Sequence, residues 1–600
     1  MSEVIGIDIG GTFIDVAISG DGGIHIAKFP STPRAPADGL FAGLAELVAA
    51  DLIRPADVRR VAHGSTVATN ALLEGAWART ALITTSGFRD VLEIGRQARA
   101  DLYDLAVERQ LPVVPRDLRF EVNERVAADG DVLTPVQVAE VKALASILKE
   151  MDVESIAVVF LFSFLFPDHE REVRRVLAQE LGVPITLSSD VLAEFREFER
   201  SSTTVICAAL RPVIEGYIGR IGQLAKAMDL PQSWQIMQSS GAVTGARNAA
   251  SEPARIVLSG PAAGVEGARL IGRLAGETDL ITLDMGGTSC DVALIRNGKI
   301  SRVSSGKVAG YPIAMQMADI HTIGAGGGSI AWIDAGGALR IGPQSAGADP
   351  GPACYGRGGR AATVTDAHVV LGHLLVDRPI GGLPRLDGEK AREAISRLAE
   401  DLSLSIERTA LGILEVADAA MERAIRVMTI ERGHDPRGFA LLAFGGAGPL
   451  HAVSIARRMS IPRVLVPAAA GVLSALGLLA AETGRDESRS IVRPLRDVEL
   501  NEISGVIDEL TRRGRGALLE EGVPERAMAV AVSGDLRYLG QSHELAIPVL
   551  GVRGGRVDAA TVDALEAAFH ESHRARFGHA RPERAVEWVT VRVRVTGPPE

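Results

Sequence analysis

Cysteine is scarce in this sequence, and its scarcity excludes two kinds of site. Only three cysteines occur among 600 residues, and no two of them have the CxxC spacing. They are Cys207, Cys290 and Cys354. A disulfide-stapled scaffold needs several paired cysteines, and a thiolate zinc site needs cysteines at short spacing. The sequence therefore predicts neither.

Aromatic residues and net positive charge are also lacking. Aromatics make up 4% of the chain, whereas glycine reaches 65 residues, so we expect aliphatic cores and many tight turns. Lysine and arginine number 64 against 75 acidic residues, a net charge of −11. Nucleic-acid binding requires clustered basic residues, so this balance disfavours a nucleic-acid partner.

No uninterrupted hydrophobic run is long enough to span a bilayer, which takes about 20 residues. Residues 155–166 are too few, and residues 464–481 are interrupted by Pro467, Gly471 and Gly477. The first eight residues carry acidic side chains and lack the pattern of a signal peptide. We therefore expect two buried core segments, no membrane association and a cytoplasmic protein.

One motif occurs twice. Residues 8–18 read DIGGTFIDVAI and residues 284–294 read DMGGTSCDVAL, with seven of eleven positions identical. Each copy follows an apolar run, and Gly-Gly permits a tight turn between two strands. A separation of 276 residues is far longer than a solenoid repeat. The pattern predicts two similar α/β lobes that each begin with the same hairpin.

The hairpins have the composition of a phosphate and cation site. Asp8 and Asp284 end apolar strands, where aspartate is disfavoured, so both positions indicate function. Turn N–H groups and threonine hydroxyls bind anions, while the two carboxylates can hold Mg²⁺ through water. Asp15 and Asp291 are weaker candidates, because strand alternation alone can place them in solvent. The predicted phosphate-binding residues are Gly10, Gly11, Thr12, Gly286, Gly287 and Thr288.

Two later glycine clusters fit the same site. An apolar strand at 439–444 precedes GGAGP, in which Gly445, Gly446 and Gly448 are predicted to bind nucleotide at the start of a helix. A second cluster at 324–329 contributes Gly326 and Gly327. No GxxxxGK[ST] sequence is present, so a P-loop ATPase is excluded.

These motifs resemble those of the actin, sugar-kinase and heat-shock-chaperone ATPases, and longer segments resemble the hydantoinase A / 5-oxoprolinase family. The segments are HGSTVATNAL (63–72), GRQARADLYDL (95–105), LSGPAAGVEGA (258–268), DIHTIGAGGGSIAWID (319–334), GPQSAGADPGPACYGRGG (342–359), FGGAGPLHA (444–452) and DLRYLGQSHEL (535–545). Family members usually continue past the equivalent of Val595, whereas this sequence ends at Glu600.

The resemblance implies an α/β fold of two ribonuclease-H-like lobes around a nucleotide cleft, plus a smaller C-terminal α+β domain. We expect the first lobe over residues 1–190, the second over 191–490 and the C-terminal domain over 491–600. A long helix is expected near 407–432, where apolar residues recur at helical spacing before Gly433.

Four further residues are candidates for substrate contact. His63 ends a strand before a helix start, where capping is an equally good explanation. Asp319 and His321 precede a glycine run, and the resemblance favours a cleft position for them. Asp349 lies in a Pro-Gly loop too long to be a simple connection.

The resemblance also implies a reaction. Phosphorylation of the amide oxygen of a cyclic amide, such as a hydantoin or 5-oxoproline, turns a poor electrophile into an activated imidate that water can attack. The implied cofactors are ATP and Mg²⁺. No HExxH or other hydrolytic metal motif is present in this sequence. In the family that the motifs resemble, the second step is associated with a separate B-type subunit, so the resemblance implies such a partner in a hetero-oligomer.

Other functions remain open at this point. A ketone carboxylase subunit, acting on acetone or acetophenone, would use the same cleft, and a stand-alone small-molecule kinase would release a phosphorylated product. A chaperone-like ATPase would respond to peptides, and a simple binding module would hold ATP without turnover.

Overall fold

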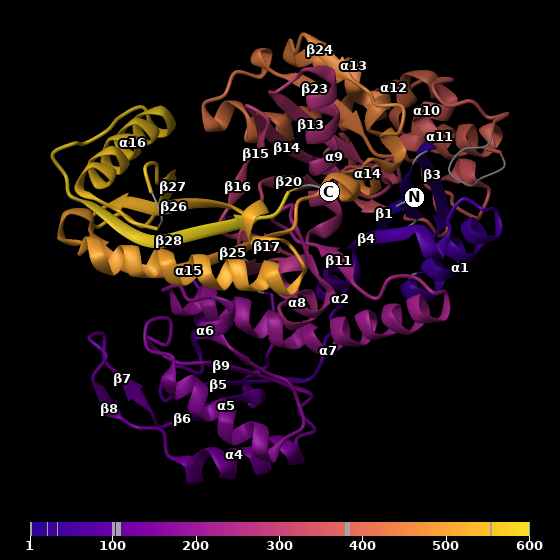
Figure 1. Ribbon diagram of the computed structural model, residues 1–600. Coiled ribbons are helices and arrows are strands. Elements are labelled where there is room, and N and C mark those ends of the chain that lie inside the picture. The colour runs from indigo at the N-terminus through magenta and orange to yellow at the C-terminus, as the bar shows by residue number, and fades with distance from the viewer. Residues whose placement is uncertain are drawn as a thin grey trace.

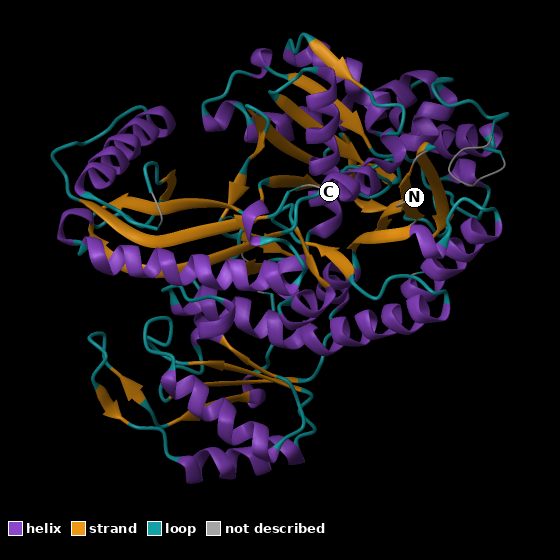
Figure 2. Cartoon of the chain, viewed as in Figure 1, coloured by secondary structure: helices purple, strands orange, loops and turns teal. Residues whose placement is uncertain are grey.

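The computed structural model describes residues 3–11, 13–20, 22–32, 34–98, 103, 110–378, 385–552 and 555–598. Figure 1 shows two sheet-containing lobes that meet at the right and top of the view, a separate sheet below them and a C-terminal sheet at the left. Figure 2 shows helices packed around each of these sheets.

The first lobe contains a sheet of six strands. Their order is β12-β11-β4-β1-β2-β3, in which β1 pairs with β2 in antiparallel fashion and with β4 in parallel fashion. The strands are β1 (Glu3–Ile9), β2 (Phe13–Gly20), β3 (Gly23–Pro30), β4 (Val58–Ser65), β11 (Trp234–Met237) and β12 (Val243–Gly245). The predicted first hairpin is thus β1–β2.

The second lobe repeats this arrangement. Its strand order is β15-β14-β13-β23-β24, which matches β3-β2-β1-β4-β11 in the first lobe. In both sheets the third strand of the lobe lies at one edge, followed by the second, first, fourth and fifth strands. A short strand, β20 (Ile320–Ile323), also pairs with β14. The main strands are β13 (Leu280–Met285), β14 (Cys290–Arg296), β15 (Lys299–Ile300), β23 (Ala440–Phe444) and β24 (Arg463–Leu465). The predicted second hairpin is β13–β14.

Two helices, α9 (Ser259–Ala275) and α14 (Leu473–Ala480), pack between the sheets, and their small apolar residues share one core with both lobes. The other face of the first sheet packs against α1 (Pro36–Ala49) and α7 (Glu197–Ala227). The other face of the second sheet packs against α12 (Ile406–Met428) and α13 (Gly448–Met459). The lobes are therefore joined through α9 and α14.

Glycines allow α9 and α14 to touch backbone to backbone. A Cβ on Gly477 would lie 1.9 Å from the Ala263 carbonyl oxygen, and a Cβ on Gly267 would lie 2.4 Å from the Leu473 carbonyl oxygen. Real side chains are not accommodated at such distances, because the obstructing atoms belong to the backbone. This junction has no room for a larger residue.

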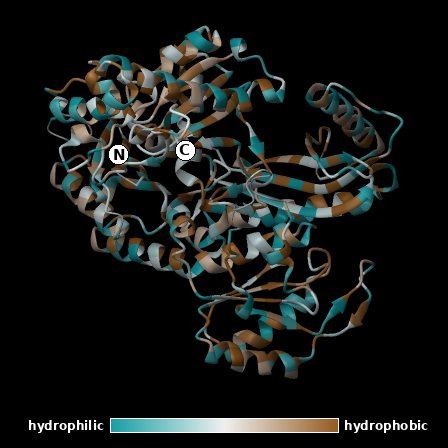
Figure 3. Cartoon of the chain, turned by 180° about the vertical axis from the view of Figure 1, so that it is seen from behind, coloured by the Kyte–Doolittle hydropathy of each residue, from teal (hydrophilic) through white to brown (hydrophobic). Residues whose placement is uncertain are grey.

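Residues 80–187 contribute a separate parallel sheet in the order β10-β9-β5-β6. The strands are β5 (Thr80–Thr85), β6 (Arg119–Val122), β9 (Ser155–Val159) and β10 (Ile185–Leu187), and helices α4 (Val138–Glu150) and α5 (Asp168–Glu180) lie beside them. Figure 3 shows hydrophobic residues concentrated along these strands. The chain then returns to the first lobe through β11, so the boundary expected at residue 190 does not coincide with the edge of the first sheet.

The C-terminal sheet has the order β25-β28-β26-β27 and packs against α15 (Leu500–Glu520) and α16 (Ala559–Phe577). Its strands are β25 (Gly484–Pro494), β26 (Ala529–Tyr538), β27 (Leu545–Pro548) and β28 (Val586–Thr596). Because β25 extends over residues 484–494, it crosses the expected boundary at 490. The expected domain limits at residues 190 and 490 therefore stay predictions.

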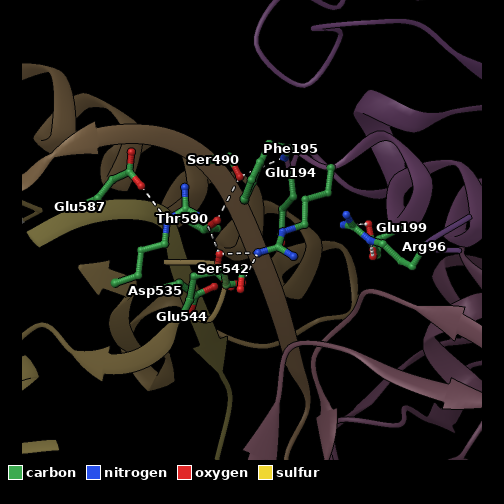
Figure 4. A network of polar contacts seen from close by, with 12 residues as sticks. Arg96, Glu194, Phe195, Glu199, Ser490, Asp535, Ser542, Glu544, Glu587 and Thr590 are labelled. Atoms are coloured by element: carbon green, nitrogen blue, oxygen red, sulfur yellow. Dashed lines mark hydrogen bonds and ion pairs between the residues drawn. The ribbon is translucent and has the colours of Figure 1, made fainter. Parts of the chain in front are cut away.

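A polar network joins this domain to the segment before α7 (Figure 4). Arg592 donates to Asp535 and to Glu194 at 2.6 Å each, and Arg196 donates to Glu544 at 2.6 Å. Asp535 and Glu544 belong to the segment DLRYLGQSHEL. That segment therefore fixes a domain junction.

Within the described ranges, no helix is long and apolar enough to cross a membrane. The two apolar segments singled out in the sequence contribute β9 to the lower sheet and β24 and α14 to the two-lobe core. Both are core segments, as predicted.

Candidate active site

The hairpins bring four carboxylates to the same side of their sheets. Asp8 pairs in register with Asp15, and Asp284 pairs with Asp291. Register partners in antiparallel strands share a face, and the alternate residues of β1 and β13 pack into the outer cores. All four side chains thus point towards the region between the lobes, where α9 lies.

Helix α9 contacts both candidate catalytic aspartates through glycine. A Cβ built on Gly260 would lie 3.5 Å from Asp8 Oδ1, and one on Gly264 would lie 3.3 Å from Asp284 Oδ2. These glycines are one helical turn apart, about 6 Å along the axis. The equivalent aspartates of the two lobes therefore lie beside successive turns of one helix.

Lys28 on β3 also reaches these four aspartates, which are together called the carboxylate group below. It forms an ion pair with Asp15 and donates a hydrogen bond to the Gly471 carbonyl oxygen of the second lobe at 3.0 Å. Asp8 Oδ1 is buried and has no hydrogen-bond partner among the described residues. The group thus combines concentrated negative charge with an oxygen free for a ligand.

Burial and mutual repulsion raise the pKa values of these carboxyl groups. Burial, followed by the charge of Asp15, raises the pKa of Asp8 to about 7. Burial raises the pKa of Asp291 to about 6. The pKa of Asp284 lies well above its usual range because of burial and the charges of Asp291 and Asp8. A bound divalent cation would lower these pKa values, since it favours the ionised form.

We predict that Asp8 makes the ligand-free fold less stable as pH rises. Its pKa is 3.8 when exposed and about 7 in the fold, so its stabilising contribution is present below 3.8 and is lost as pH rises through 7. Asp8→Asn removes this dependence. The melting temperature of the variant minus that of the parent should therefore increase between about pH 5 and about pH 8.

The matched control is Asp168→Asn on α5, because the Asp168 side chain is 89% exposed. The control should follow the parent at each pH. A constant difference between the Asp8 variant and the parent across this range would contradict the assignment.

The two hairpin turns have the same hydrogen-bond pattern. Gly10 N–H donates to the Phe13 carbonyl oxygen at 2.9 Å, and Gly286 N–H donates to the Ser289 carbonyl oxygen at 3.1 Å. These two predicted phosphate donors therefore close the turns themselves.

The tips of both turns are open. The space that a Cβ on Gly11, Gly286 or Gly287 would occupy has no protein atom of the described chain within 4 Å. Thr288 is exposed at the second tip, and the predicted residue Thr12 lies outside the described residues. The tips are accessible to a ligand.

The GGAGP segment lies against the second hairpin. Gly445 has a φ of +77°, and a Cβ there would lie 2.4 Å from Asp284 Oδ1. Gly448 begins α13 and packs against the Leu283 carbonyl oxygen. Gly446 is open, and no side chain caps the start of α13. The helix therefore presents its amino end beside Asp284, where it favours an anion.

The glycine cluster at 324–328 supports the hairpin turn from behind. Gly327 N–H donates to the Gly286 carbonyl oxygen at 3.0 Å. A Cβ on Gly326 would lie 2.5 Å from the Thr288 backbone nitrogen, and the Gly326 N–H donates to Ser329 Oγ at 2.8 Å. The N–H groups of both predicted donors are thus engaged within the protein, which favours a supporting role.

Two candidate substrate residues lie in packed surroundings. His63 is fully buried: its Nε2 lies 2.7 Å from the Tyr217 hydroxyl, its Nδ1 lies 3.2 Å from the Ile7 carbonyl oxygen, and burial lowers its pKa to about 4. Asp319 is 9% exposed and forms an ion pair with Arg432. The structure does not bring either side chain to the carboxylate group.

The other two candidate substrate residues, His321 and Asp349, also lie apart from the carboxylate group. Thr322 donates to Asp291, so the preceding residue of β20, His321, faces the opposite side of the sheet, where α12 packs. Asp349 is exposed in the loop at 346–352, which is anchored by the Ala346 N–H donating to the Gly328 carbonyl oxygen at 2.8 Å. The roles of these four residues in substrate binding stay predictions.

The residues present fit a magnesium nucleotide. Mg²⁺ prefers oxygen ligands and is usually held by one or two carboxylates, with water and phosphate completing its shell. Asp8 and Asp284 supply such carboxylates, and the open turns and the start of α13 supply the surroundings for phosphate. In the described ranges, no cluster of three His, Cys, Asp or Glu side chains has the geometry of a metal site.

Sequence reasoning undervalued Asp15 and Asp291 and missed Lys28 and the glycines of α9. The signal for the aspartates was the hairpin register, which pairs each with a candidate catalytic residue. The signal for α9 was the spacing of Gly260 and Gly264, four residues apart on one helix face. No signal in the sequence identified Lys28.

Comparison with known proteins identifies what the chain resembles. The family model described as Hydantoinase/oxoprolinase N-terminal region matches residues 4–181, and the model described as Hydantoinase/oxoprolinase matches residues 200–487. The caprolactamase subunit alpha of Pseudomonas jessenii is 35% identical, over 98% of this chain and 86% of its own.

Two solved structures are similar along nearly the whole chain. The crystal structure of ATP-dependent caprolactamase from Pseudomonas jessenii has a TM-score of 0.89 at 34% identity, covering 99% of this chain and 87% of its own. A nucleotide-free acetone carboxylase structure has a TM-score of 0.78 at 27% identity, covering 100% and 88%.

Proposed function

The chain belongs to the hydantoinase/oxoprolinase family, and on that basis we propose that it is the ATP-dependent subunit of a cyclic amide hydrolase. The expected family and the expected fold, α/β with two actin-like lobes and a C-terminal α+β domain, are confirmed. The proposed reaction is phosphorylation of the amide oxygen of a lactam, hydantoin or 5-oxoproline, followed by hydrolysis with a B-type partner.

The observation that carries the proposal is the pairing of Asp8 and Asp284 beside α9. The two carboxylates hold the cation, and the hairpin tips and the start of α13 orient phosphate. When bound, magnesium ATP supplies the phosphoryl group that activates the amide oxygen. Such catalysis depends on position and charge neutralisation more than on a protein nucleophile. The carboxylate group has the negative charge and the open surroundings that this requires.

The shared helices suit a cleft that closes on its ligands. Because α9 and α14 pack against both sheets, a change in the angle between the lobes bends or shifts these two helices. Closure excludes water from the phosphate site and so limits wasteful hydrolysis. The cytoplasmic location expected from the sequence stays a prediction.

A carboxylase reaction is the second candidate, because the acetone carboxylase structure is similar over the entire chain. In that case the same carboxylate group would serve phosphorylation of a ketone enolate and of bicarbonate. A stand-alone kinase is the third candidate, distinguished by release of a stable phosphorylated product.

We predict that the purified chain alone opens no cyclic amide. It should release phosphate slowly at most, whereas the complex with its partner should open a ring with about one ATP consumed per ring. Caprolactam, 5-oxoproline and hydantoin are the substrates to test, with ring opening followed by chromatography and phosphate release measured in parallel.

Three outcomes would redirect the assignment. Ring opening by the isolated chain would contradict the two-subunit reaction. Turnover of a ketone only when bicarbonate is present would identify a carboxylase. Accumulation of a phosphorylated small molecule without a partner would identify a kinase. The complex carrying Asp8→Asn controls for contaminating phosphatase activity, because it should release no phosphate above background.

A further inference from the structure

A row of hydrogen-bonded side chains runs from the interior of the second lobe to its surface. Asp418 Oδ1 on α12 lies 2.6 Å from His451 Nδ1 on α13. His451 Nε2 lies 3.1 Å from His368 Nε2 on α10 (Val364–Val370), and His368 Nδ1 lies 3.0 Å from His373 Nδ1. His451 and His368 are each 1% exposed, whereas His373 is exposed. The row therefore connects a buried carboxylate with solvent.

The chemistry of the groups determines which atom donates at each contact. A carboxylate accepts, so His451 donates from Nδ1 and accepts at Nε2 when neutral. His368 then donates from Nε2 and accepts at Nδ1, and His373 donates from Nδ1. Every hydrogen bond in the neutral row points inward, with Nε2 of His373 left to meet solvent.

The row lies directly behind the candidate phosphate site. His451 is in the first turn of α13, three residues after Gly448. On α10, Thr365 precedes His368 by one turn, and its N–H and hydroxyl both donate to the Gly327 carbonyl oxygen at 2.8 Å. Helices α10 and α13 thus contact the second hairpin and its supporting loop. His368 and His451 connect the two helices about one helical turn away from these contacts.

Electrostatics opposes a charge here while the phosphate site is empty. The amino end of a helix carries a partial positive charge, which disfavours an imidazolium within the first turn. An anion bound at that end outweighs this partial positive charge and therefore favours a protonated imidazole nearby. Burial, with the charges of His451 and His373, lowers the pKa of His368 to about 3, so a proton does not rest on the middle ring. At the inner end of the row, the Asp418 carboxylate lies 2.6 Å from His451 Nδ1 and is the anionic partner in contact with that ring.

We propose that His451 takes up a proton through this row when phosphate groups bind at the start of α13. The inference rests on the proposed nucleotide function. A solvent proton bonds to Nε2 of His373, whose Nδ1 proton passes to Nδ1 of His368. The Nε2 proton of His368 passes to Nε2 of His451. The imidazolium of His451 then lies against Asp418, and each hydrogen bond between histidines persists with its direction reversed.

Several other charged groups on the surrounding helices have partners of their own. On α12, Glu422 pairs with Arg426 and with Arg458 of α13. On α10, Asp366 accepts from Thr363 and from the Cys354 N–H. On α11 (Gly388–Leu402), Lys390 pairs with Asp387. Ser454 of α13 donates to the second oxygen of Asp418. Asp418 is thus the carboxylate bonded to the row.

The test is a proton count during nucleotide binding. The β,γ-imido analogue of ATP, with magnesium, is titrated calorimetrically into the full chain at about pH 7 in two buffers of different ionisation enthalpy. The parent should take up about one proton more per bound analogue than His451→Asn, since asparagine donates to Asp418 and accepts from His368 without holding a proton. Comparison of the two proteins cancels protons exchanged by the nucleotide itself.

Two further variants serve as controls. Glutamine at position 373 can donate to or accept from His368 but cannot relay a proton, so His373→Gln should keep the uptake at equilibrium while slowing it. His25→Gln replaces an exposed histidine on β3 and should match the parent. Loss of uptake in His373→Gln but not in His451→Asn would place the proton on the surface ring and overturn the proposal. Equal proton counts in the parent and His451→Asn would also overturn it.

A measurement on the parent alone covers the case in which His451→Asn does not fold. Spectra of ¹⁵N-labelled histidine side chains should show one additional ring with both nitrogens protonated when the analogue saturates the protein. An unchanged number of such rings would overturn the proposal while leaving nucleotide binding intact. Absence of any binding heat would instead refute the proposed nucleotide function.

Discussion

Asp284→Asn is expected to lower magnesium-dependent ATP hydrolysis by about 100- to 1,000-fold, because it removes charge from the cation site while keeping the shape of the side chain. The fold should remain intact. Burial and the charges of Asp291, Asp8 and Asp15 raise the pKa of Asp284, so in the ligand-free protein asparagine replaces a carboxyl group that is already neutral. The measurement is phosphate release at saturating ATP, with melting temperature and calorimetric binding of the ATP analogue on the same preparation.

Asp168→Asn on α5, beside the lower sheet, provides the matched control and should hydrolyse ATP at the parent rate. A folded Asp284 variant with parent activity would refute the assignment of this carboxylate. If Asp284→Asn lost activity because it unfolded, its melting temperature would fall. The assignment predicts an unchanged or higher value.

Gly477→Ala is the second substitution for which we expect a large effect, because a Cβ there would lie 1.9 Å from the Ala263 carbonyl oxygen. Neither helix backbone can yield by a side-chain rotation, so α9 and α14 must separate. We expect a loss of about 3 kcal/mol of stability, near the upper range for overpacking. Because α9 also positions Gly260 and Gly264 beside the two aspartates, activity should fall by about 100-fold even below the unfolding transition.

Gly216→Ala controls for the change from glycine to alanine within a helix. Gly216 lies on α7 with open space around it, so alanine should stabilise the helix by about 0.5–1 kcal/mol. Urea unfolding followed by circular dichroism compares the two variants. An unfolding midpoint for Gly477→Ala equal to that of the parent would show that the two helices tolerate separation, and the inference that their junction has no room for a larger residue would be wrong.

Local patterns in the sequence predicted the elements that carry the site. Each Asp-Gly-Gly-Thr motif follows an apolar run, and each forms the predicted hairpin. The strand before GGAGP is β23 and the following helix is α13. The expected long helix is α12, and a short turn at Ile430–Arg432 extends it to Gly433, which has a φ of +79°. Such features depend on neighbouring residues, so alternation, helical spacing and glycine placement suffice to predict them.

The same local patterns could not decide which side chains meet. His63 and His321 belong to segments with strong family resemblance, yet His63 packs under α7 and His321 faces α12. Both positions depend on sheet partners and covering helices from distant parts of the chain. Gly326 and Gly327 are glycine-rich like a phosphate loop, but their N–H groups bind protein because the loop lies behind the second hairpin.

The sequence by itself determined the repeat, and with it two equivalent lobes and two equivalent aspartates, because that information lies within eleven consecutive residues of each copy. Only the tertiary structure decided that Asp15 and Asp291 join those aspartates, that Lys28 reaches them, and that α9 separates them by one helical turn. These relations depend on strand register and on contacts between distant segments, such as Asp8 with Gly260 and Lys28 with Gly471, and long-range packing fixes them only when both lobes are folded.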